Sequence, residues 1–133
     1  MRQRTSFHRL AQEGGQTLVE FALTVLVLLT LVFGLIEFSR AIYAASVIQW
    51  AAQHGARIGV EHYPDMSEMA LKAQIETAVR SRMTGLNQGA AEILVDLPAP
   101  EIVQVDVSYP FEFAITWFAE GITLDASASM VAH

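Results

Sequence analysis

The hydrophobic pattern of the chain opens with an uninterrupted apolar run. From Phe21 to Ile36 there is no charged residue, and Leu, Val, Ile and Phe predominate without proline. A helix rises about 1.5 Å per residue, so residues 16–36 would span roughly 30 Å, close to the thickness of the hydrocarbon layer of a bilayer. The pattern therefore predicts a transmembrane helix over 16–36.

Two other interpretations of this run fit less well. A buried helix of a soluble protein would normally show a polar stripe, and the run offers only Thr24, Thr30 and Gly34. A cleaved secretory signal has a shorter apolar core followed directly by a small-x-small site, whereas Glu37 and Arg40 come first here.

Helical spacing continues beyond the run, so residues 37–60 are predicted to form the outer half of the same helix. Small residues four apart on this half would permit the close approach of another helix, although alanine is also simply a good helix former. Trp50 is expected either to anchor the helix at the outer membrane surface or to pack under a sheet. The pairs considered for helix packing are Ala41 with Ala45 and Ala52 with Ala56.

The pattern changes again in the remaining part, residues 61–133, which is predicted to be an extracytoplasmic α+β domain. The stretch GVEHYPD at 59–65 indicates a break, and Asp65 with Glu68 resembles a capping box for a second helix. That helix should end near Arg82 or Met83, before Gly85, with Leu71, Ile75, Ala78 and Val79 on its apolar face. Alternating residues then predict strands at 92–97, 102–109, 111–115 and 122–131.

One-sided alternation in these strands indicates a small antiparallel sheet with one covered face. The outer half of the long helix, helped by the second helix, is expected to cover that face. The predicted fold class is therefore α+β, with a long N-terminal helix and a second helix packed on a small antiparallel sheet.

The distribution of charge predicts the orientation. The net charge is −6, but Arg2, Arg4 and Arg9 precede the apolar run with one acid, Glu13, among them. From Glu61 onward, eleven acidic residues face three basic ones. The positive-inside tendency places the N-terminus in the cytoplasm and the domain across the membrane. So acidic a domain argues against a nucleic-acid partner and against adhesion to anionic lipid head groups.

Candidate chemistry is sparse, and we expect neither an enzyme nor a cofactor. The chain has no cysteine, no glycine-rich phosphate loop and no nucleophile motif. His54 with Glu61 and His62 meets no recognised ligand spacing, so no metal site is expected. Trp117 and Phe118 are expected in a turn, either buried in the core or exposed to a partner subunit.

Glu20 is the one residue that the apolar pattern does not explain. A charge deep in lipid costs on the order of 3 kcal/mol, and less near an interface, so an intramembrane carboxylate suggests a function. Glu20 could simply extend its carboxylate to the cytoplasmic surface. Alternatively, a cut after Gly15 would create an α-amine on Gln16, and this amine in one chain could neutralise Glu20 in another.

The same residues carry a family resemblance. The sequence GGQTLVEF at 14–21 resembles a type IV prepilin processing site, with Glu20 and Phe21 at the fifth and sixth mature positions. With GLIEFSR at 34–40 and AAQHGAR at 51–57, the N-terminal segment is similar to TadE-like pseudopilins of the tight-adherence (Flp) pilus system. Many relatives have a proline early in the span, where this chain has Thr24-Val25-Leu26. TadG-type proteins are usually much longer, which favours the TadE-like branch.

The resemblance implies a pilin-like fold and a role in pilus biogenesis as a minor pilin or pseudopilin. It implies a cytoplasmic leader, residues 1–15, that a prepilin peptidase removes after Gly15. The implied partners are this peptidase, other pilins or pseudopilins, the inner-membrane assembly platform and the lipid bilayer. The implied location is the bacterial inner membrane, with a single span and a periplasmic domain, and entry into the pilus is left open. The alternative function is a signal-anchored envelope protein that binds a partner without entering a pilus.

Overall fold

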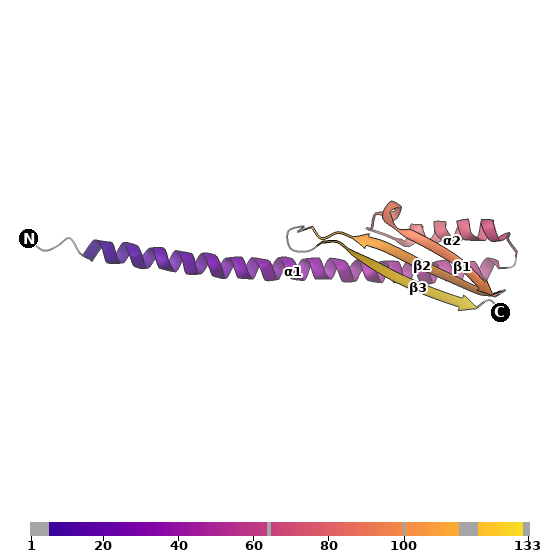
Figure 1. Cartoon of the computed structure of the whole chain (residues 1–133), viewed down its shortest axis with the longest axis horizontal. Helices are drawn as coiled ribbons and strands as arrows, with labels where there is room; N and C mark the ends of the chain where they lie inside the picture. The colour runs from indigo at the N-terminus through magenta and orange to yellow at the C-terminus, as the bar shows by residue number, and fades with distance from the viewer. Residues whose placement is uncertain (1–5, 64, 100, 115–119, 132–133) are drawn as a thin grey trace, which may run out of the picture. The chain divides into compact units, whose positions relative to one another are not determined.

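The computed structural model describes residues 6–63, 65–99, 101–114 and 120–131, with side chains from residue 15 onward. Its backbone confirms the α+β class (Figure 1). By internal contacts the chain divides into two compact units, Met1–Phe38 and Ser39–His133. The elements are α1 (Ser6–His62), α2 (Glu68–Arg82), a 3₁₀ turn η1 (Gln88–Ala90), β1 (Glu92–Ala99), β2 (Ile102–Phe111) and β3 (Ile122–Val131).

The first unit consists of the N-terminal part of α1, which already begins at Ser6, within the predicted leader. Its large apolar side chains from Leu18 to Ile36 are exposed within the structure. The helix is long and apolar enough, by length and composition, to cross a membrane. The span predicted over residues 16–36 lies within this helix.

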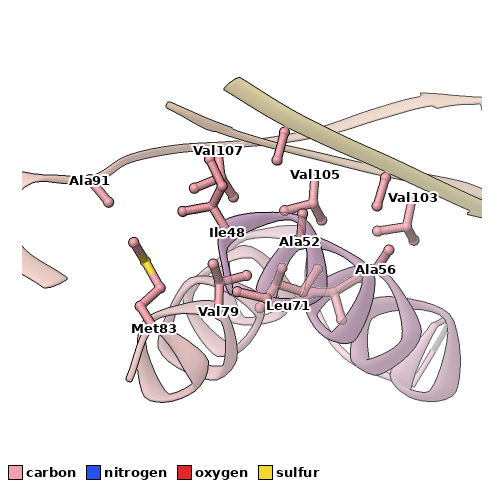
Figure 2. Packing of buried hydrophobic residues seen from close by; sticks show 14 residues of the cluster. Ile48, Ala52, Ala56, Leu71, Val79, Met83, Ala91, Val103, Val105 and Val107 are labelled. Atoms are coloured by element: carbon pink, nitrogen blue, oxygen red, sulfur yellow. The ribbon is translucent and has the colours of Figure 1, made fainter. Parts of the chain in front are cut away.

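The second unit is a two-layer domain. The three strands form one antiparallel sheet in the order β1-β2-β3. The C-terminal part of α1 and α2 pack against the same face of this sheet, as predicted (Figure 1). Figure 2 shows Ile48, Ala52 and Ala56 of α1 pointing into a cluster with Val103 and Val105 of β2. The sheet therefore has one covered face and one free face.

Two glycines, Gly55 and Gly59, lie inside α1, which was predicted to extend to residue 60 and ends at His62. A Cβ atom on Gly59 would lie 2.6 Å from Val103 Cγ1 and 2.8 Å from Ile75 Cδ1. A Cβ atom on Gly55 would clash in the same way with Val79. Both glycines therefore serve the close packing of α1 on β2 and α2, and the helix continues to His62.

The second helix also differs from the prediction at its start. The N-cap of α2 is Ser67, whose side chain makes no capping hydrogen bond, so the capping box at Asp65 is wrong. Asp65 instead donates its backbone N–H to the carbonyl of His62 at 3.0 Å, in the turn between the helices. The C-terminal end is as predicted, because Gly85 adopts a positive φ of 77° just after the helix.

The strand predicted over 111–115 does not form as a separate element. Phe111 ends β2 and residues 112–114 are not in a strand, while Ile115 lies outside the described residues. Pro110 does not end β2, because β1 pairs with β2 only as far as Ser108. Pro110 therefore lies beyond the end of β1, where a missing N–H is tolerated.

Candidate processing and assembly site

The segment that the sequence singled out lies on the exposed surface of α1. Gly15, Gln16, Glu20 and Phe21 are all exposed, and Phe21 retains 66% of its accessible surface. The peptide between Gly15 and Gln16 is helical. Glu20 lies four residues beyond Gln16, about 6 Å along the helix axis.

The described residues give no packing reason for a glycine at position 15. A Cβ atom there would meet no described atom within 4 Å, as at Gly34 and in contrast to Gly55 and Gly59. Its φ is not positive either, since Gly85 is the glycine with positive φ in the described part of the chain. Glycine inside a helix costs about 1 kcal/mol relative to alanine. The cost at Gly15 therefore serves something other than packing within this chain.

Two threonines in the apolar run satisfy their own hydroxyl groups. Thr24 Oγ1 donates to the carbonyl of Glu20 at 2.9 Å, and Thr30 Oγ1 donates to the carbonyl of Leu26 at 2.8 Å. Such bonds to the preceding turn allow a hydroxyl to be placed in lipid. The charge of the Glu20 carboxylate cannot be neutralised by such a bond. Glu20 is therefore the residue of this segment that costs the most free energy to place in lipid.

The first unit buries none of its most apolar stretch within the structure. Leu18, Leu31 and Leu35 each keep about two thirds of their surface exposed. Contiguous apolar surface of this extent is not stable in water and requires lipid or other helices around it. The segment is therefore built to be covered by something outside this chain.

The small-residue pairs separate into two groups. Ala52 and Ala56 are fully buried in the core of the second unit, where they allow α1 to approach the sheet and α2. Ala41 and Ala45 are half-buried. Among the four alanines, only Ala41 and Ala45 therefore keep surface that another chain could contact.

Sequence reasoning missed a cationic groove on the second unit. Trp50 is 54% exposed, so it does not pack under the sheet. The Arg82 guanidinium at the end of α2 lies 5.1 Å from the centre of the Trp50 ring, and His54 stacks on the same ring with centroids 6.4 Å apart. A guanidinium over an indole face is an attractive cation–π contact.

The groove has a volume of about 380 Å³ and is also lined by Gln53, Arg57 and Glu61. Partial burial, then the charges of Arg82 and Arg57, lower the pKa of His54 below its usual 6.5. Within the described residues, neither arginine forms an ion pair, whereas Lys72 and Arg80 of α2 pair with Glu68 and Glu76. The groove is therefore a concentration of positive charge on an otherwise acidic domain.

Part of this groove was visible in the sequence. Trp50, His54, Arg57 and Glu61 follow helical spacing on one face of the long helix. The contribution of Arg82 was not visible, because it depends on how α2 returns along α1.

No catalytic constellation emerges from the described side chains. In that part of the chain, no three His, Asp or Glu residues come together in a group able to hold a metal ion. Trp117 and Phe118, for which burial or partner contact was expected, lie outside the described residues.

Together these features define a class: a small α+β protein preceded by an apolar helix long enough to cross a membrane. Comparison with known families is more specific, because the model of the TadE-like protein family matches residues 15–57. The match begins at Gly15 and covers about a third of the chain, all of it within α1. Over this range the chain is similar to TadE-like proteins, in line with the resemblance found in the sequence. No curated protein and no solved structure matches the chain.

Proposed function

We propose that this protein is a membrane-anchored minor pilin or pseudopilin of the Tad (Flp) pilus, cleaved after Gly15 by a prepilin peptidase. One observation carries the proposal: the family match starts at a glycine that no described residue packs against. A glycine in a cleft of a peptidase avoids a steric clash there, and a glycine in a helix makes local unwinding easier. Cleavage after Gly15 would explain why the family match begins at this residue and why the residue is a glycine.

Cleavage would also offset the free-energy cost of placing the Glu20 carboxylate in the membrane. The new α-amine on Gln16 has an ordinary pKa near 8 and carries a positive charge at neutral pH. When two mature chains pack side by side, the amine of one neutralises the carboxylate of the other. Breaking such a pair in lipid leaves an uncompensated charge, so the pair sets the register between chains.

The biological role follows from these two steps. The mature chain is held in the inner membrane by residues 16–36, with its acidic domain in the periplasm. Its partners are the prepilin peptidase, other pilins or pseudopilins and the assembly platform. It acts as a structural component without catalytic activity of its own, and its exposed apolar helix is the part that joins an assembly.

The test is the intact mass of the chain purified from its native membrane. We expect the first fifteen residues to be missing from the wild-type protein and to be retained in Gly15→Arg. Gln12→Arg adds the same charge to the leader away from the cut and should be processed normally. A wild-type chain that keeps its leader while pili are being made would leave the signal-anchored envelope protein as the better reading.

The role of Glu20 is tested separately. Glu20→Ala should insert into the membrane and lose its leader, because it removes a costly charge and leaves the cut intact. It should nevertheless reduce piliation, because the α-amine of the neighbouring chain loses its partner. Normal piliation in this variant would remove the charge-pairing hypothesis and leave the processing step standing.

A further inference from the structure

We propose that the cationic groove of one copy binds the free face of the sheet of a second copy, so that neighbouring domains associate front to back. This contact rests on the proposed function in one respect, namely that copies stand parallel in the same membrane. Ile58 and Met130 complete the lining of the groove, whose polar and aromatic residues are those already described: Trp50, Gln53, His54, Arg57, Glu61 and Arg82.

The free face of the sheet is the acidic counterpart of the groove. The covered face takes Val103, Val105 and Val107 of β2, so the alternate residues of each strand point to the free face. On all three strands, the charged residues among these alternate positions are acids. They are Glu92, Asp96, Asp106 and Asp125.

The register gathers these acids into one patch. Glu92 and Asp125 are both paired with Ser108, and Ser108 Oγ donates a hydrogen bond to Asp125. Asp106 is paired with Leu94, a large apolar residue that keeps 60% of its surface exposed. On the edge strand β1, the apolar side chain of Leu94 is thus flanked by Glu92, Asp96 and Asp106.

The two surfaces complement each other in kind. The groove presents the half-exposed indole of Trp50 beside two guanidinium groups, and the sheet face presents Leu94 beside carboxylates. An aromatic anchor next to arginine is the composition typical of energetically important interface residues. Opposite charges on the two surfaces favour this pairing and suppress groove-to-groove or sheet-to-sheet contacts.

The two surfaces also lie at the same level along α1. Val103 lies against Gly59, and Val105 lies against Gly55. Gln104, between the two valines, therefore lies at the height of Arg57 along the axis of α1. Asp96 is paired with Gln104 and is therefore also level with Arg57.

A second link lies about two turns lower on α1. Gln49 Nε2 of α1 donates to the carbonyl of Ser127 at 3.1 Å. Because Ser127 is paired with Asp106, Asp106 is level with the turn of α1 that carries Trp50. Two domains whose outer α1 segments run parallel can therefore bring the groove of one to the sheet face of the other.

The geometry of the contact determines the kind of assembly. The groove belongs to the helix layer and the acidic patch to the opposite side of the sheet, so the interface joins two different surfaces. Such heterologous contacts leave one groove and one patch unused at the ends of a pair. They can therefore repeat along a row, which an isologous dimer cannot do.

Site-directed crosslinking of the full chain in its native membrane tests this contact. The chain contains no cysteine, so introduced thiols are unambiguous. Gln53→Cys lies in the groove and Ser127→Cys lies on the free face beside Asp106. Membranes containing both single variants should give a crosslinked dimer with a short bismaleimide. Ser81→Cys, exposed on α2, is the matched control and should give little product with Gln53→Cys.

Charge exchange then tests the specificity. Arg57→Glu with Arg82→Glu in one copy should lower the crosslinking yield about tenfold, as for the loss of two charge pairs. Asp96→Lys with Asp106→Lys in the other copy should restore it. The yield should also fall with increasing salt, because surface charges are screened.

The outcomes that would overturn the contact are distinct from failure of the proposed function. No 53–127 product, a product only between two groove cysteines, or a product with a different protein would each refute it. Leader removal is read on the same gel. A processed chain without crosslinks refutes only the contact, and a crosslinked chain that keeps its leader refutes only the processing.

Discussion

Gly59 of α1 lies so close to Val103 of β2 that a Cβ atom would stand 2.6 Å from Val103 Cγ1. Gly59→Ala should therefore destabilise the domain, by about 1–2 kcal/mol after the gain in helix propensity is set against the overpacking. Thermal unfolding of the detergent-solubilised chain, followed by circular dichroism, measures this. Gly89→Ala is the control, since its Cβ would be 3.5 Å from Asn87 Oδ1, an ordinary contact. Equal melting temperatures for the two variants would contradict the packing argument.

Arg80 connects α2 to the turn before β1. Its guanidinium donates to Glu76 Oε1 at 2.8 Å and 3.1 Å, and to the backbone carbonyls of Gln88 and Ala91. Arg80→Ala should cost about 1–2 kcal/mol of unfolding free energy, because these carbonyls lose a charged donor.

Lys72→Ala is the comparison for Arg80→Ala. Lys72 makes an exposed ion pair with Glu68 on the same helix, which is worth about 0.3–0.5 kcal/mol. Denaturant unfolding should therefore separate the two variants clearly. Arg80→Lys should fail to restore full stability, since an ammonium group cannot reach Glu76 and the carbonyls together. Complete rescue by lysine would show that charge alone matters at this position.

The lowered pKa of His54 predicts a pH dependence of stability. Burial and the neighbouring Arg82 and Arg57 make protonation harder in the folded state than in the unfolded chain. The unfolded state therefore binds more protons as the pH falls below about 6.5, so folding stability decreases from there down to the folded pKa. This contribution is complete above pH 6.5 and absent below the folded pKa.

Unfolding midpoints measured between pH 5 and pH 7.5 test this dependence. His54→Gln should flatten the pH profile within this window, and Arg82→Gln should reduce its slope by a smaller amount. The smaller effect is expected because burial, rather than Arg82, is the first cause of the shift. An unchanged slope in His54→Gln would show that the dependence arises elsewhere in the chain.

The proposed orientation in the membrane can be tested with single cysteines. Ser81→Cys, exposed on the domain, should react with a membrane-impermeant maleimide in intact spheroplasts. Ser6→Cys in the leader should react only after the membrane is opened with detergent, in a Gly15→Arg background that retains the leader. The opposite labelling pattern would place the acidic domain in the cytoplasm and exclude a periplasmic role.

Local signals in the sequence predicted most elements of the fold. Ile122–Val131 was predicted with the bounds that β3 has, because its alternation depends only on which residues face the core. The errors occurred where a residue has two possible meanings. Asp65 resembled a helix cap but lies in the turn before α2, and Pro110 was read as a bend or an edge and lies within β2 beyond the end of β1.

The proposed functional surfaces also divide into those that the sequence indicated and those that only the structure revealed. The apolar run, Gly15 and Glu20 were recognisable from the sequence, because a candidate membrane segment and a proposed cleavage site are both local in the chain. The groove at Trp50 and Arg82 and the acidic sheet face were not, because their residues come from separate elements. The sequence alone thus determined that the chain has an apolar helix followed by an acidic α+β domain. Only the tertiary structure decided which charges gather on which side, since that depends on the return of α2 along α1 and on the register of the three strands.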